Sequence, residues 1–147
     1  MDVFIELADK LPEDYQIVLV GTNKEVDRQL PNNIISIHRT RNQIELAEIY
    51  SAADLFVNPT REENYPTVNM ESIACGTPVL TFRTGGSPEI IDENCGCVVD
   101  CDDKEDLISS IIEIRNSNRF QRQACLDKSR AFDANDRFAE YIKLYDM

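Results

Sequence analysis

Apolar positions along the chain alternate between helical spacing and short continuous runs. From Val3 to Leu11 they recur three and four positions apart, and Pro12 predicts the end of this helix. Residues 15–20 form a short, mainly apolar run closed by Gly21, which is typical of a strand buried on both faces. The alternation continues along the chain. Further strands are predicted at 34–37, 54–57, 78–82 and 97–99, and helices at 23–30, 43–52, 67–75, around 89–91 and in segments from 103 onward, the last at about 135–146.

Repeated strand–helix units with short connections indicate a Rossmann-like α/β fold. Residues 1–147 are predicted to form one domain, with a mainly parallel sheet of about five strands and helices on both faces. Such sheets bind ligands at the carboxyl ends of their strands, where loops enter the next helix. The loops at 21–24, 58–68 and 83–88 are therefore the expected site.

Charge narrows the class of ligand. The formal net charge of −12 argues against binding to nucleic acid or to an anionic membrane surface, because both need clustered basic residues. Local arginines remain available to hold one phosphorylated small molecule. The candidates are Arg39, Arg41, Arg61 and Arg83.

The beginning of the chain and its hydropathy lead us to expect a cytoplasmic protein. The first ten residues lack the basic segment of a signal peptide. No apolar run approaches the roughly 20 residues needed to cross a bilayer.

Several residues that can ligate metals occur without the spacing of a metal site. The five cysteines lack a paired CxxC arrangement, so free thiols are expected, and Cys95 and Cys97 should share one face of a strand. Residues 100–102 match an Asp-x-Asp metal motif, but they precede a helix, where capping explains them more simply. His38, the one histidine, is predicted to be structural. No metal and no cofactor are expected.

The segment from Arg61 onward carries the clearest chemistry. Glu63 lies in a predicted loop and Glu71 about a turn and a half into the next helix, so both carboxylates can face one ligand across the helix N-terminus. Pro66 is predicted as the first helical residue, and the free amides of the first turn favour negative charge. Carboxylates accept several hydrogen bonds from sugar hydroxyls. Spacing alone leaves open that these acids are solvated surface residues.

The order of residues around the two glutamates is specific. Glu63, seven residues and Glu71 are followed by Ala74-Cys75-Gly76-Thr77-Pro78-Val79, and the flanks read Ala-Ala-Asp-Leu-Phe-Val-Asn-Pro-Thr at 52–60 and Gly-Gly-Ser-Pro-Glu-Ile-Ile at 85–91. This arrangement resembles the signature of the group-1 (family 4) retaining glycosyltransferases, which have the GT-B fold. The resemblance covers about residues 15–114.

The resemblance implies a role for each candidate residue. Members of the family use a nucleoside-diphosphate sugar as donor, retain the anomeric configuration and require no metal. Glu63 would be the catalytic carboxylate, in contact with the donor hexose, and Glu71 would bind the ribose. The other residues would bind the donor sugar and phosphates (Asn64, Tyr65, Thr67, Val68, Gly85 and Gly86) or line the base (Arg39, Thr40 and Arg41). Pro66 stands where the family usually has glycine, which removes one amide from the phosphate contact.

Complete members of the family have two similar domains, and this resemblance covers only the second. We therefore expect the N-terminal GT-B domain and the first strand of this domain to be missing, which would leave strands 17–20 and 55–58 each with an unpaired edge. The chain alone is predicted to be inactive. Any peripheral association with a membrane would come through the missing domain or the acceptor. The last helix would cross to the first domain, exposing Phe138, Tyr141 and Tyr145.

Three other interpretations stay open. A sugar-nucleotide epimerase of the same fold would need further acid–base residues, and the chain has one histidine. A glycogen-synthase-like enzyme shares the paired glutamates. A non-catalytic, flavodoxin-like interaction domain is the third, although a phosphate-accepting receiver would have aspartate where this chain has Asn58. A role in polysaccharide biosynthesis is expected only because many members of the family have one.

Overall fold

The computed structural model describes residues 1–145, in which helices and strands alternate. The strands are β1 (Ile17–Val20), β2 (Ile34–Ile37), β3 (Phe56–Asn58), β4 (Val79–Phe82) and β5 (Gly96–Val99). The helices are α1 (Asp2–Lys10), α2 (Lys24–Asp27), α3 (Gln43–Ala52), α4 (Thr67–Ala74), α5 (Ser87–Ile90), α6 (Lys104–Ser117), α7 (Arg122–Ser129) and α8 (Ala134–Tyr145), with a 3-10 helix, η1 (Arg130–Phe132), before the last.

The strands are parallel, as predicted, and form two sheets. β1 pairs with β2, whereas β4 lies between β3 and β5. In the larger sheet Val79 is opposite both Phe56 and Gly96. Within residues 1–145, β1 and β3 each pair along one edge only, which agrees with the unpaired edges predicted for these two strands.

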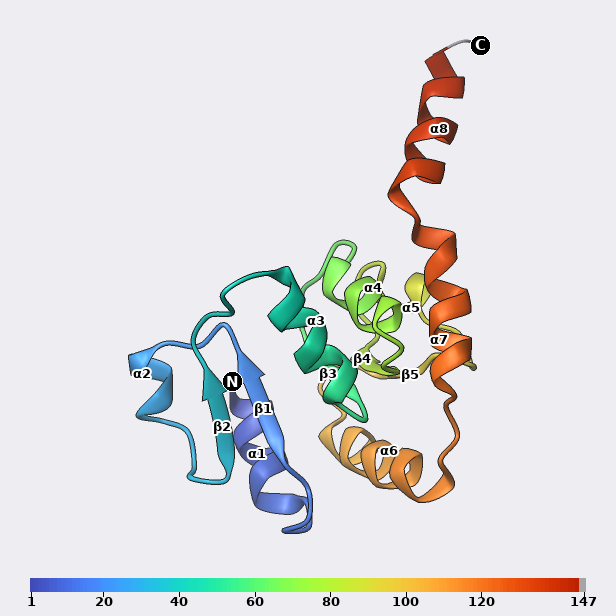
Figure 1. The fold of residues 1–147 in the computed structure, drawn as a ribbon. Helices are drawn as coiled ribbons and strands as arrows, with labels where there is room; N and C mark the ends of the chain where they lie inside the picture. Colours follow the sequence, from blue (N-terminus) through green and yellow to red (C-terminus); the bar gives the residue numbers. More distant parts are fainter. Residues whose placement is uncertain (146–147) are drawn as a thin grey trace.

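Two apolar clusters, one on each side of β4, form the core. The larger contains α1, α6 and residues of β4 and β5, and the smaller contains α4, α5 and α7 (Figure 1). Side chains of β4 alternate between them, because Leu80 and Phe82 belong to the larger cluster and Val79 to the smaller. Helices therefore cover both faces of the three-stranded sheet.

The prediction that residues 15–20 are buried on both faces is wrong. Ile17 packs against the larger cluster, but Val18 and Val20 point to the opposite face and are 41% and 40% exposed. Ile35, opposite Val18 in the register, is 49% exposed. An apolar run is buried on both faces only where helices cover both, and α1 lies against one face of this pair (Figure 1).

Helix N-termini follow local capping chemistry. The side chains of Asn23 and Asn42 accept hydrogen bonds from first-turn amides of α2 and α3, and Asp103 does the same for α6. These caps begin the helices close to the predicted positions. α2 is shorter than predicted and ends at Asp27.

The two ends of α4 differ in how well the sequence predicted them. At its C-terminus Gly76 has a φ of +80°, and the amides of Gly76 and Thr77 donate to the carbonyls of Ile73 and Ser72, which is a Schellman motif. At its N-terminus the predicted range, 67–75, begins at the observed residue, but the expectation that Pro66 is the first helical residue is wrong. Pro66 is the N-cap, with an extended backbone (φ −73°, ψ 105°), and Thr67 is the first helical residue.

The last helix, α8, projects away from the rest of the chain (Figure 1). It was predicted at about 135–146 and is observed at Ala134–Tyr145, with residue 146 outside the described residues. Phe138 is 68% exposed, as predicted. The side chains of Tyr141 and Tyr145 lie outside the described part of the structure. No helix between residues 1 and 145 is both long and apolar enough to span a membrane.

Candidate functional site

Two loops at the carboxyl ends of β3 and β4 lie against each other. The Gly86 N–H donates to the Asn64 carbonyl at 2.6 Å, and the Thr84 hydroxyl donates to the Thr60 carbonyl at 2.8 Å. The loop that carries Glu63 and the Gly85-Gly86 turn are therefore in direct contact.

The two glycines allow this close approach. A Cβ atom on Gly85 would lie 1.7 Å from the carbonyl oxygen of Glu63, and the φ of +48° at Gly85 is itself unfavourable for other residues. A Cβ atom on Gly86 would lie 2.4 Å from Cδ2 of Tyr65. The turn thus requires glycine at both positions to stay in contact with the Glu63 loop.

Glu63 is half-buried, and its neighbours in the loop are exposed. Its Oε1 atom accepts a hydrogen bond from the Asn64 amide at 3.1 Å. Among the described residues no side chain or amide donates to Oε2, so this oxygen is free to accept from a ligand. The Tyr65 ring beside it is 45% exposed.

The start of α4 offers backbone donors next to Glu63. Pro66 has no side-chain cap to give, and the amides of Thr67 and Val68 lie in the first turn, where a helix provides no internal acceptor. Both residues are exposed. Uncapped amides at a helix N-terminus favour an anion, so this end of α4 suits a phosphate group.

Glu71 is exposed on α4 and is held by Tyr50 of α3. The Tyr50 hydroxyl donates to Oε2 of Glu71 at 3.3 Å. Burial, followed by the charge of the Glu71 carboxylate, raises the pKa of the Tyr50 hydroxyl. Tyr50 therefore stays protonated at neutral pH and acts as a donor. The sequence predicted a helix at 43–52 but did not indicate this contact.

A buried polar network supports the β3–α4 loop, and the sequence analysis missed it. The Asn58 amide donates to Oδ1 of Asn69 at 2.9 Å, and the Thr81 hydroxyl donates to the Asn58 carbonyl at 3.0 Å. Two fully buried polar atoms, Nδ2 of Asn69 and Oγ of Ser87, have no partner among the described residues. The one signal in the sequence was the position of Asn69 between two apolar residues, Val68 and Met70, of the predicted helix.

The predicted base loop, Arg39 to Arg41, lies at the carboxyl end of β2. No hydrogen bond or ion pair described for residues 1–145 joins it to the Glu63 loop. Its connection is indirect, through α3, whose Asn42 caps the N-terminus and whose Tyr50 reaches Glu71. Ile44, in the first turn of α3, is 70% exposed beside this loop and was not predicted as a site residue.

Three of the four arginines considered for phosphate binding are paired with acids on the surface. Arg61 bridges Asp2 at 2.5 Å and Asp102 at 2.6 Å, Arg83 pairs with Asp100 at 3.0 Å, and Arg41 pairs with Glu45 at 3.2 Å. The Arg61 guanidinium holds the pKa of the Asp2 carboxyl well below its usual range. Within residues 1–145, Arg39 alone among the four forms no ion pair.

His38 and the Asp-x-Asp motif have structural partners. Nε2 of His38 lies 2.6 Å from Oδ2 of Asp27, as expected for a hydrogen-bonded structural histidine. Asp100 and Asp102 pair with arginines instead of capping α6, which corrects the capping explanation, because the cap is Asp103.

Cys95 and Cys97 pack into different apolar clusters. Cys95 lies in the turn before β5 and packs into the smaller cluster, whereas Cys97 packs against the larger one, so the prediction that they share a face is wrong. The turn, closed by the Cys95 amide on the Asp92 carbonyl, breaks the strand periodicity. Among residues 1–145 no group of three His, Cys, Asp or Glu side chains could hold a metal ion.

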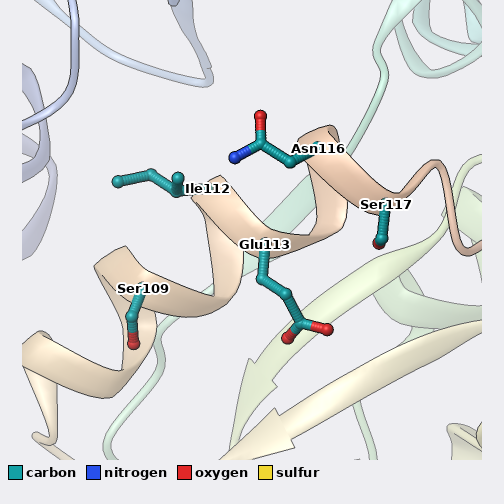
Figure 2. A pocket seen from close by; sticks show the side chains of 5 residues that line it. All are labelled: Ser109, Ile112, Glu113, Asn116 and Ser117. Carbon is teal, nitrogen blue, oxygen red and sulfur yellow. The ribbon is translucent and has the colours of Figure 1, made fainter.

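Two hollows on the surface lie away from the predicted site. One, of about 550 Å³, runs along α6 between Ser109 and Ser117 (Figure 2). The other, of about 710 Å³, lies between α1, Pro31, Asn33 and Lys104. Neither is lined by a residue predicted to bind the donor.

Comparison with known proteins supplies a family. The family model described as "Glycosyl transferases group 1" matches residues 1–117. A D-inositol 3-phosphate glycosyltransferase from Corynebacterium jeikeium is 34% identical over 120 residues, which cover 72% of this chain and 29% of that protein. The sulfoquinovosyl transferase SQD2 from Arabidopsis thaliana is 27% identical over 143 residues, 90% of this chain and 28% of the relative.

Solved structures share the fold. Sucrose-phosphate synthase from Thermosynechococcus elongatus superposes with a TM-score of 0.84 at 23% identity, covering 99% of this chain and 41% of that one. Alr3699/HepE from Anabaena, in complex with UDP, gives a TM-score of 0.77 at 18% identity, over 97% of this chain and 44% of that one. The C-terminal domain of the group 1 protein LpcC from Francisella tularensis gives 0.70 at 23% identity, over 88% and 76%.

Proposed function

The chain belongs to the group 1 glycosyltransferases, and on this premise we propose that it is the nucleotide-sugar-binding half of a retaining enzyme. The enzyme would transfer a hexose from a nucleoside-diphosphate sugar to a glycan or lipid-linked acceptor. The chain spans about 29% of the length of the Corynebacterium relative, so the activity of the whole protein is part of the proposal.

One observation carries the proposal. The loop of Glu63 and the Gly85-Gly86 turn are in contact beside the uncapped N-terminus of α4. The contact is so close that a Cβ atom on Gly85 would lie 1.7 Å from the carbonyl oxygen of Glu63. This arrangement places a free carboxylate oxygen, a tight glycine turn and first-turn amides next to one another. A sugar attached to a diphosphate has hydroxyls for the carboxylate and negative charge for the amides.

The chemistry follows from where charge develops. When the bond between the hexose and the diphosphate breaks, negative charge grows on the leaving phosphate. The amides of Thr67 and Val68 and the dipole of α4 would stabilise that charge. Glu63 would hold the hexose through its hydroxyls, and Glu71 would fix the ribose. No metal is required for these contacts, and the proposal is that none is used.

The first test is binding of nucleotides to the purified chain. UDP, GDP and ADP and their glucose derivatives would be screened by thermal shift, followed by calorimetric titration in EDTA. UDP and UDP-glucose come first, because a protein of the same fold has been solved with each of them. We expect one nucleotide to raise the melting temperature, and EDTA to leave its affinity unchanged. No binding by any of them would contradict the proposal.

The ribose role of Glu71 is tested by Glu71→Ala. Because Glu71 is exposed, we expect little change in unfolding by urea and about a tenfold loss of affinity for the nucleotide, the effect of a lost hydrogen bond to a charged group. The matched control is Glu62→Ala, which removes an exposed acid from the loop before α4. Equal affinity of Glu71→Ala and wild type would count against the role.

The chain alone should bind donor without transferring sugar. Release of nucleoside diphosphate from the donor, with and without candidate acceptors, would be followed by chromatography. Clear turnover by the 147-residue chain would refute this part of the proposal. Conversion of the donor sugar to an isomer would instead favour the epimerase interpretation.

A further inference from the structure

Tyr50 is the residue that connects α3 to Glu71, although it lies 21 positions away in the sequence. We propose that Tyr50 is a positioning residue for nucleotide recognition, which fixes the Glu71 carboxylate so that it distinguishes ribose from 2′-deoxyribose. This inference rests on the proposed ribose role of Glu71. It adds that the hydrogen bond from Tyr50 makes the contact of Glu71 with the ribose specific.

The contact occupies one side of the carboxylate. Tyr50 donates to Oε2 of Glu71, and no described residue donates to Oε1. A carboxylate held by one fixed donor loses rotational freedom about its last torsion angle. The second oxygen is then already oriented for a hydroxyl, so less conformational entropy is lost when a ligand binds.

The Tyr50 ring is itself immobilised. The residue is 9% exposed, and its ring meets that of Phe56 edge-on, with 5.3 Å between the centroids and an angle of 77°. Phe56 is the first residue of β3, in the three-stranded sheet. The phenol oxygen is thus fixed relative to the sheet that carries the Glu63 loop.

The backbone of Tyr50 is tied to the far end of α4. The Thr77 hydroxyl, buried just after that helix, donates to the Tyr50 carbonyl at 2.5 Å. One residue of α3 therefore contacts α4 through Glu71 and the segment after α4 through Thr77. Two contacts of this kind fix the position of the helix that carries Glu71 as well as the orientation of its carboxylate.

The experiment compares UDP with 2′-deoxy-UDP by calorimetry on the full 147-residue chain. GDP and ADP, each with its 2′-deoxy analogue, are titrated in parallel in case the base differs. The variants are Tyr50→Phe, which keeps the ring and its contact with Phe56, Glu71→Ala, and the two together. Tyr15→Phe is the matched control, because Tyr15 stacks under Arg115, and Arg115 also pairs with Asp14.

We expect wild type and Tyr15→Phe to prefer the ribonucleotide. Tyr50→Phe should reduce that preference about three- to tenfold, mainly by weakening the ribonucleotide, with binding of the 2′-deoxy form little changed. In the Glu71→Ala background the second substitution should have no further effect, because Tyr50 acts through Glu71. Loss of the preference without loss of the folded state is not expected of a merely structural residue.

A second variant keeps the inference testable if Tyr50→Phe fails to fold. Thr77→Val removes the hydrogen bond to the Tyr50 carbonyl, which still accepts from the Ala53 amide, and leaves the phenol in place. It should reduce the ribose preference by a smaller factor than Tyr50→Phe. An unchanged preference in both variants overturns the inference even if Glu71→Ala abolishes the preference. If Glu71→Ala itself leaves the preference unchanged, or if no nucleotide binds, it is the proposed function that fails.

Discussion

The middle strand of the larger sheet and the first strand of the smaller one have similar sequences and very different surroundings. β4 lies between two strands and two helix layers, and its four residues are no more than 1% exposed. β1 pairs along one edge, and Val18 and Val20 are 41% and 40% exposed. Whether an apolar strand is buried therefore depends on the helices and strands packed around it. A run of apolar residues indicates only that the strand can be buried.

The comparison also separates the parts of the candidate site. The Glu63 loop, the Gly85-Gly86 turn and α4 are built on the well-packed sheet, whereas the predicted base loop follows β2 of the more exposed one. Residues that contact the sugar and phosphates would therefore be carried by the well-packed, three-stranded sheet. The base would be bound by the loop after β2, in the more exposed two-stranded sheet.

The largest expected difference is between two glycines with positive φ. Gly85→Ala would place Cβ 1.7 Å from the Glu63 carbonyl oxygen, whereas Gly21→Ala, after β1, meets no atom within 4 Å. Backbone strain alone costs about 1–2 kcal/mol at either position. Gly85→Ala should lose about 1–3 kcal/mol more, from overpacking, and should abolish nucleotide binding. Urea unfolding measures both, and equal losses would contradict the assigned contact.

A smaller difference is expected between two apolar side chains. Leu80→Ala in β4 should destabilise the protein by about 2–5 kcal/mol, because Leu80 is fully buried between the helix layers. Val18→Ala in β1 should cost less than about 1 kcal/mol, because much of that side chain already meets water. The midpoints of urea unfolding give the values. Comparable losses would mean that the exposed face of β1 is covered in solution.

The smallest expected effect needs no mutation. Amide hydrogen exchange should be at least about tenfold faster for β1 and β2 than for β4, because the smaller sheet has fewer buried contacts and can open locally. Exchange followed by NMR at neutral pH reports each amide separately. Equal protection of the two sheets would show that they unfold as one unit.

Local chemistry made much of the fold predictable. β2 and α3 were predicted at the residues where they occur, because Asn42 provides a cap and the apolar positions keep one period. Pro66 was misplaced by one position, because proline is favoured both before and at the first turn of a helix. The exposure of Val18 could not be read locally, since it depends on helices elsewhere in the chain.

The arrangement of the candidate site was predictable only where its residues belong to a motif that the sequence shows. Glu63 and Gly85 were named from their motifs, and the structure places their loops in contact. The bond from Tyr50 to Glu71 and the bridges from Arg61 to Asp2 and Asp102 span 21 to 59 positions. Nothing in the local pattern specifies such pairs, because they are set by how the strands are ordered in the sheets.

The measurement that tests the central claim most directly is a map of where the donor binds. The ¹⁵N-labelled chain would be titrated with the nucleotide sugar that gives the largest thermal shift, and amide resonances followed by NMR. We predict that the resonances of Tyr65, Thr67, Val68, Gly85 and Gly86 shift together with one dissociation constant, while those of Ser109 and Asn116 in the α6 hollow do not. Shifts confined to α6, or to the hollow beside α1, would contradict the account.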